Sequence, residues 1–185
     1  MSWLAVSTVG QFVVIALLAV TVLSLARQIG ILHERTGIAS LVNKRLALDI
    51  GDVLPEMAIP TLAGEQITLG LAVSGWVALL FLAADCPICR SVLPAYQKCL
   101  NDAPTIQGYW VVDGMQLAAT EEYSRSHGIA GEALLVSQEL GLRFGIARLP
   151  AIAVLDADSR LVLQRGVNGP KQVVRLFREL EIPGS

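Results

Sequence analysis

The feature that most constrains this sequence is a pair of cysteines placed where a buried strand gives way to a helix. Residues 76–82 form a continuous apolar run with about the length of a buried strand. Cys86, Pro87, Ile88 and Cys89 follow it, and apolar residues then recur at helical spacing. This order predicts a strand that leads into a helix, with the first cysteine at the start of that helix.

The two thiols of this motif are predicted to differ in reactivity. Cys86 falls at the helix N-terminus, where free N–H groups and the positive end of the helix dipole stabilise a thiolate. Pro87 stands at an early helical position that needs no amide donor. Cys89 comes about one turn later, within reach of a disulfide. Thiol–disulfide exchange needs this spacing, because an exposed thiolate attacks and a shielded partner resolves the mixed disulfide.

Two cysteines at this spacing also occur in other kinds of site. Zinc needs four ligands, and the remaining candidates, Cys99, His33 and His127, form no second pair. A purely structural disulfide stays open. We favour redox chemistry because the motif stands between a strand and a helix, and we expect no metal and no cofactor. Cys99 lies on the helix after the motif and is expected to be a buried, inert thiol.

The first 26 residues carry no charged side chain, and they hold most of the apolar excess of a chain that is 54% apolar. Residues 4–26 are long enough to cross about 30 Å of hydrocarbon as one helix. A cleaved signal peptide is the alternative, since Ser24 and Ala26 are small residues at a suitable spacing. However, no basic segment precedes the apolar run, and the run is longer than usual for a signal peptide. We therefore expect an uncleaved transmembrane anchor over residues 1–26.

The charges that follow this anchor conflict with the expected chemistry. Arg27, Arg35, Lys44 and Arg45 lie after the span and no basic residue precedes it, so the positive-inside rule would hold the C-terminal domain in the cytoplasm. Redox enzymes on membrane anchors usually work outside, where disulfides persist. On these functional grounds we expect a single-pass inner-membrane protein with its globular domain in the periplasm.

The rest of the chain is expected to form a juxtamembrane linker over residues 27–49 and one globular domain over residues 50–185. Besides the helix of the motif, the expected strands and helices cover residues 57–62, 66–69, 76–82, 107–112, 117–127, 133–136, 138–144, 151–155, 160–165 and 170–180. Their order predicts an α/β fold, with a mixed sheet flanked by helices on both faces. The net charge of −2 indicates no nucleic-acid partner.

These residues resemble the thioredoxin-like superfamily, in its membrane-tethered TlpA-type branch. The resemblance covers residues 50–180 and is carried by Gly51-Asp52 with Pro55, by Gly64 with Ile67-Thr68-Leu69, by the cysteine motif, and by Leu149-Pro150 before the strand at 151–155. It implies a thioredoxin-like fold in which the loop with Pro150 faces the cysteines. The catalytic residues would then be Cys86, Cys89, Pro87 and Pro150. Leu149 and Ile88 would bind the substrate, with the Leu149 backbone aligning an extended segment.

A narrower resemblance is to the MauD family of methylamine utilisation proteins. It is carried by residues 24–35 (SLARQIGILHER), by the cysteine motif and by residues 144–150 (FGIARLP). The family is implicated in the maturation of methylamine dehydrogenase, so the resemblance implies a protein that forms or isomerises disulfides in the small subunit of that enzyme. It also implies a polytopic membrane partner, MauE, which exchanges electrons with the motif.

Other functions on the same fold stay open. They are a generic TlpA-type thiol reductase, a non-catalytic assembly factor and a copper chaperone, although the chaperones space their cysteines one residue further apart and add a distant histidine. A peroxiredoxin-type peroxidase needs a proline and a Thr or Ser ahead of its cysteine, and residues 80–85 offer neither.

Two positions depart from the thioredoxin pattern. Thioredoxins commonly keep a buried acid on the strand before the motif, whereas residues 79–82 are all apolar. A proton acceptor for Cys89 would therefore have to be water or another group. The residue before the first cysteine is Asp85, whose negative charge opposes the stabilisation of a Cys86 thiolate by the helix dipole.

Overall fold

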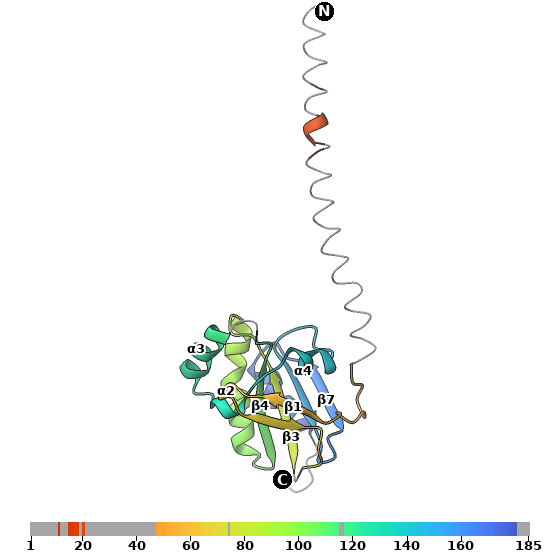
Figure 1. Cartoon of the computed structure of the whole chain (residues 1–185), viewed down its shortest axis with the longest axis vertical. Coiled ribbons are helices and arrows are strands. Elements are labelled where there is room, and N and C mark those ends of the chain that lie inside the picture. Colours follow the sequence, from red (N-terminus) through yellow and green to blue (C-terminus); the bar gives the residue numbers. More distant parts are fainter. Residues whose placement is uncertain are drawn as a thin grey trace, which may run out of the picture. The chain divides into compact units, whose positions relative to one another are not determined.

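A computed structural model describes residues 11, 15–18, 20, 47–73, 75–114 and 117–180 of the chain. The chain divides into two units, Met1–Arg45 and Leu46–Ser185, and Figure 1 labels several elements of the second. The described positions of the first unit are helical. Most of the predicted anchor and nearly all of the predicted linker lie outside the described residues. Within the described ranges, no helix is both long and apolar enough for a membrane span.

Five strands form the central sheet, in the order β5-β4-β3-β6-β7. The middle strand β3 (Trp76–Phe81) runs parallel to β4 (Ile106–Val112), which runs parallel to β5 (Leu134–Val136). On its other side β3 pairs antiparallel with β6 (Ala151–Leu155), and β6 pairs antiparallel with β7 (Leu161–Gly166). The continuous apolar run of β3 is explained by this central position, where both faces are covered.

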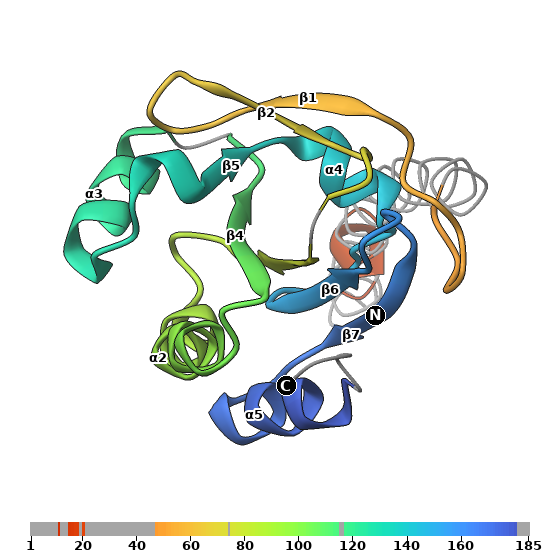
Figure 2. The ribbon, with the colours of Figure 1, turned by 90° about the horizontal axis from the view of Figure 1, so that it is seen from below.

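One face of the sheet carries the helix of the motif. α2 (Pro87–Asp102), α3 (Leu117–His127) and α5 (Pro170–Glu179) cover this face, and buried residues of all three share one core (Figure 2). Tyr96 of α2 donates hydrogen bonds of 2.8 and 3.1 Å to the carbonyl oxygens of Ala78 and Tyr109 on the sheet. These bonds hold α2, and with it the motif, in place against β3 and β4.

The other face carries α4 (Gln138–Arg143) and a separate two-stranded sheet of β1 (Met57–Pro60) and β2 (Gln66–Leu69). A second core fills this side, and Phe144 packs its ring 5.5 Å from that of Phe81. A 3₁₀ turn over Gly131–Ala133 leads into β5. Two independent cores therefore fix the central sheet from opposite sides.

The predicted mixed sheet with helices on both faces is confirmed. The expected segments are all present, and their ends differ from the expected ones by at most two residues. One such difference is at β7, which begins at Leu161 rather than residue 160. Arg160 instead forms an isolated bridge with Val53, because the loop after residue 50 runs alongside this strand.

Candidate active site

The motif cysteines occupy the first turn of α2. Cys86 is the N-cap residue, with φ −88° and ψ 112°, and Pro87 begins the helix behind it. The sulfur of Cys86 accepts a hydrogen bond of 3.2 Å from the backbone N–H of Cys89. The sulfur therefore meets one of the free amides of the helix terminus, where the helix presents partial positive charge.

The two thiols differ in their exposure to solvent. Cys86 is half-buried, whereas Cys89 is fully buried at 0% exposure, and both are free thiols. Burial, and after it hydrogen bonding with the Cys86 side chain, raises the pKa of Cys89 to about 12. The pair thus has the accessible and the shielded sulfur that exchange requires. The catalytic roles of the two residues stay a prediction.

The loop before β6 lies at the same end of the sheet as the motif. Ala151, the first residue of β6, pairs with Phe81, the last residue of β3, from which the chain runs on towards Cys86. The Leu149–Pro150 peptide bond is cis, and Pro150 directly precedes the strand. Proline is tolerated at that position because it need not donate to the sheet.

Leu149 and Ile88, the predicted substrate-binding residues, both present apolar side chains to solvent. Their exposed fractions are 42% and 44%. Ile88 lies between the two cysteines, and Leu149 lies just before Pro150 at the same end of the sheet. Exposed apolar side chains next to a reactive sulfur are available for contact with a protein substrate.

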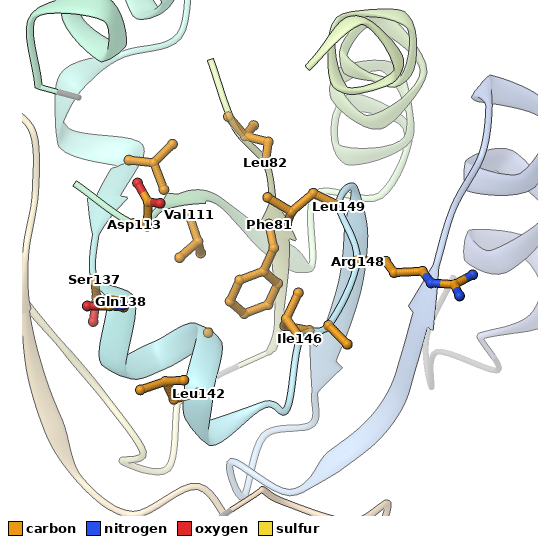
Figure 3. Close-up of a pocket in the computed structure, with 13 residues that line it drawn as sticks. Phe81, Leu82, Val111, Asp113, Ser137, Gln138, Leu142, Ile146, Arg148 and Leu149 are labelled. Carbon is orange, nitrogen blue, oxygen red and sulfur yellow. The ribbon is translucent and has the colours of Figure 1, made fainter. Parts of the chain in front are cut away.

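A cavity of about 440 Å³, here called the apolar pocket, opens beside Leu149. Figure 3 shows that its walls come from the ends of β3 and β4, from α4 and from the loop before β6. The side chain of Arg148 points away from it. Its apolar lining consists mainly of Phe81, Leu82, Val111, Leu142, Ile146 and Leu149.

A smaller cavity of about 280 Å³, here called the polar pocket, lies between the motif and α3. Ala84, Asp85 and Arg90 line it from the side of the motif, and Glu122, Tyr123, Ser126 and His127 line it from α3. The rings of Tyr123 and His127 lie 4.3 Å apart. Asp85, the residue before Cys86 in the chain, thus lines a cavity that also contains the charged side chains of Arg90 and Glu122.

Sequence reasoning missed Tyr123. It is a buried aromatic residue on a helix whose other side chains are mostly polar. That contrast could have marked it as a side chain facing the core, but the periodicity of one helix does not say which residues it faces. Its place beside the motif depends on how α3 packs against the sheet.

The remaining cysteine and one of the two histidines lie on described helices. Cys99 is buried on α2, and burial raises the pKa of its thiol, as expected for an inert core cysteine. His127 is at the end of α3, with Nδ1 2.9 Å from the carbonyl oxygen of Tyr123. His33 lies outside the described residues. The described part of the chain contains no group of three or more side chains that could hold a metal ion.

Two curated proteins show what this chain is similar to. It is 33% identical over 170 residues to the methylamine utilization protein MauD of Methylobacillus flagellatus, a match that covers 89% of this chain and 80% of the relative. It is 30% identical over 175 residues to the protein of the same name from Paracoccus versutus, covering 92% and 86%. No family model matches the chain.

Solved structures agree with the fold. The thioredoxin domain of a thiol-disulfide oxidoreductase from Bacteroides vulgatus is 18% identical, with a TM-score of 0.60 that covers 72% of this chain and 98% of the other. A thiol:disulfide interchange protein from Chlorobium tepidum is also 18% identical, with a TM-score of 0.58 and coverage of 72% and 98%. The expected thioredoxin-like fold is thereby confirmed.

Proposed function

Because the chain belongs to the MauD family of methylamine utilization proteins, we propose that it is a membrane-anchored thiol-disulfide oxidoreductase. The observation that supports this proposal best is the geometry of the motif. The sulfur of Cys86 is accessible and accepts a hydrogen bond from a backbone N–H at a helix N-terminus, whereas the sulfur of Cys89 is buried one helical turn further on. A structural disulfide would not need this difference between its two sulfurs.

The exchange runs in two steps at Cys86. Its thiolate attacks a substrate disulfide, forms a mixed disulfide and releases the other substrate sulfur as a thiolate. Cys89 then loses its proton and attacks the sulfur of Cys86, which expels the second substrate thiolate and leaves an internal disulfide. The same steps in reverse give a disulfide to the substrate. We propose oxidation or isomerisation as the physiological direction, because the family resemblance implies a client, the small subunit of methylamine dehydrogenase, that carries several disulfides.

The substrate is proposed to bind as an extended segment along Leu149. Backbone hydrogen bonds would hold the segment, and pockets on either side would select among its side chains. Leu149 belongs to the wall of the apolar pocket, so a segment aligned with it brings alternate side chains to that cavity. Ile88 offers a second apolar contact beside the attacking sulfur.

The proposed client is the small subunit of methylamine dehydrogenase, and the proposed electron-exchange partner is MauE. Support comes from the family, whose members are named for methylamine utilization. The alternatives are a generic TlpA-type reductase, a copper chaperone and a scaffold that holds its partner without chemistry.

The proposed location is the inner membrane, with the thioredoxin-like domain in the periplasm. Ile15, Leu17, Leu18 and Val20 are helical and 53–64% exposed. At 100° per residue these four positions point to all sides of the helix, and a helix that is apolar all round fits a lipid environment. Alkaline phosphatase fused to the C-terminus should be active in cells. An inactive fusion that is fully expressed would place the domain in the cytoplasm, as the charges of residues 27–45 suggest.

Trapping in the native cell tests the function. The Cys89→Ser variant should accumulate a mixed disulfide between Cys86 and the client, since the resolving thiol is gone. The same variant with Cys99→Ser should still trap, whereas one with Cys86→Ser should not. Adducts that form equally well through Cys99 would contradict the assignment. If a double Cys86→Ser, Cys89→Ser variant still supported maturation of the dehydrogenase, the protein would be a scaffold.

A further inference from the structure

The hydroxyl of Tyr123 is buried without a hydrogen-bond partner. Its side chain is 5% exposed, and its oxygen has no donor or acceptor within bonding distance among the described residues. Almost all buried hydroxyls in native proteins are paired, because an unpaired one has lost its hydration without compensation. An exception at the wall of a pocket beside the motif therefore calls for a physical explanation.

Tyr123 lies on the same face of the sheet as the two motif cysteines. It shares a core with Cys89, against which Cys86 packs, and it lines the polar pocket together with Ala84 and Arg90 from either side of the motif. Burial, and after it the negative forms of Cys89 and Cys86, raises the pKa of Tyr123 to about 12. The phenol is therefore within electrostatic range of both sulfurs.

Cys89 has no acid behind it that could assist its chemistry. Residues 79–82 are apolar and at most 3% exposed, and burial places the pKa of Cys89 far above neutrality. Nevertheless Cys89 must be a thiolate at one point of every exchange. It becomes one before it attacks Cys86, or it becomes one when it leaves Cys86 in the reverse reaction. Backbone hydrogen bonds from Ala83 and Cys89 lower this pKa but do not offset burial, so a further hydrogen-bond donor to the thiolate would speed that step.

We propose that the hydroxyl of Tyr123 is the hydrogen-bond donor that stabilises the Cys89 thiolate in the resolving step. This role rests on the proposed function. The phenol keeps its own proton throughout. In the forward direction the Cys89 proton passes to solvent in the polar pocket, and the thiolate electron pair forms the bond to Cys86. In reverse that bond breaks, the electron pair returns to Cys89, and a proton comes back from solvent.

Other charged groups near the phenol are more exposed than it is. Asp85 and Arg90 face it from the motif, Glu122 lies on its own helix, and all three are solvent-exposed. His127 stacks on the Tyr123 ring at 4.3 Å and holds its orientation from the same helix. Among the residues that line this pocket, Tyr123 is the buried one, and it belongs to the same hydrophobic core as Cys89.

The test separates the two thiols in time. The full-length protein, purified in detergent with Cys99→Ser, is reduced and mixed with 5,5′-dithiobis(2-nitrobenzoate). The first coloured thiolate reports the attack of Cys86, and the second reports the attack of Cys89 on the mixed disulfide. Tyr123→Phe keeps the ring and removes only the oxygen. It should slow the second phase about tenfold or more, as expected for a lost hydrogen bond to an anion, and leave the first phase unchanged.

Tyr109→Phe is the matched control. Tyr109 is also buried, at 7% exposure, but it belongs to the second core on the opposite face of the sheet. This variant should leave both phases unchanged. The pH profile of the second phase should move towards higher pH in Tyr123→Phe alone, because the thiolate is then harder to form.

Three outcomes would overturn the role of Tyr123. They are an unchanged second phase in Tyr123→Phe, an equal slowing of both phases, and an equal effect of Tyr109→Phe. A parent protein that releases only one thiolate would overturn the proposed function itself, and the role of Tyr123 with it. The two failures are therefore distinguishable by the behaviour of the parent protein.

Discussion

The apolar pocket and the polar pocket differ in chemistry, although residues only two positions apart in the sequence line them. Leu82 lines the apolar pocket of about 440 Å³, and Ala84 lines the polar pocket of about 280 Å³. Helix α4 and the loop with Leu149 wall the first cavity, and α3 walls the second. Contact with substrate is proposed for the apolar pocket, and movement of the Cys89 proton is proposed for the polar pocket.

Replacing Cys86, the attacking residue, should have the largest effect on the rate of disulfide exchange. Cys86→Ser removes the attacking thiolate, so the rate of disulfide exchange should fall on the order of a thousandfold or more, as for other lost nucleophiles. The assay is insulin or client-peptide disulfide exchange. Cys99→Ser is the control and should be unaffected, since Cys99 is a buried residue elsewhere on α2. A Cys86→Ser variant that retains exchange would show that Cys86 is not the attacking residue.

Alkaline pH should act through the buried side of the motif. The pKa of Cys89 is raised from 9.0 to about 12 in the folded protein. Between those values the unfolded chain has lost a proton that the folded chain keeps. The free energy of unfolding should therefore be highest below about pH 9 and fall above it, by up to about 1.4 kcal/mol per pH unit for this group.

The Cys86–Cys89 disulfide form provides the control for this effect, since it has no Cys89 proton to lose. Denaturant unfolding of both forms at several pH values above 8 measures the difference. The reduced form should lose stability more steeply, while a buried tyrosine such as Tyr109, whose pKa is raised by burial alone, contributes equally to both. Parallel curves for the two forms would show that Cys89 is not protonated as the structure requires.

A charge in the apolar pocket should weaken substrate binding without touching the thiols. Leu142→Glu places a carboxylate on its wall, where Leu142 is 46% exposed. The KM for a peptide substrate should rise about tenfold, which is the scale of one lost apolar contact. The reaction with the small aromatic disulfide should be unchanged.

Leu71→Glu is a matched control for that variant. Leu71 is likewise 46% exposed, but it lies in the loop before β3, at the end of the strand away from the motif. Equal effects of the two variants on KM would show that the apolar pocket does not bind the substrate.

The smallest expected effect concerns the wall of the apolar pocket. Ser137 is the N-cap of α4, and its hydroxyl accepts a hydrogen bond of 3.1 Å from the N–H of Leu140. Ser137→Ala should lower the free energy of unfolding by about 1 kcal/mol, measured by urea denaturation. Ser126→Ala at the polar pocket removes no cap and should cost less. A larger loss at Ser126 would indicate that α3 is the more tightly held wall.

The local part of the site could be predicted because its residues are neighbours in sequence. The apolar run of β3, the two cysteines and the proline that opens α2 all follow within fifteen residues, so periodicity and helix-capping preferences were sufficient. Leu149 and Pro150 lie some sixty residues further on. Their position relative to the motif was expected only from the resemblance to a family, since no local rule joins segments that far apart.

The sequence by itself therefore determined the strand–cysteine–helix junction and the alternation that makes a covered mixed sheet, because both follow from neighbouring side chains. The tertiary structure decided which groups meet the two sulfurs. Tyr123 reaches the motif because α3 packs on the same face as α2, and Leu142 reaches the apolar pocket because α4 packs on the other. Such contacts depend on where each helix packs on the sheet. Several placements would bury the apolar side of a helix, and only the packing of the complete core selects one of them.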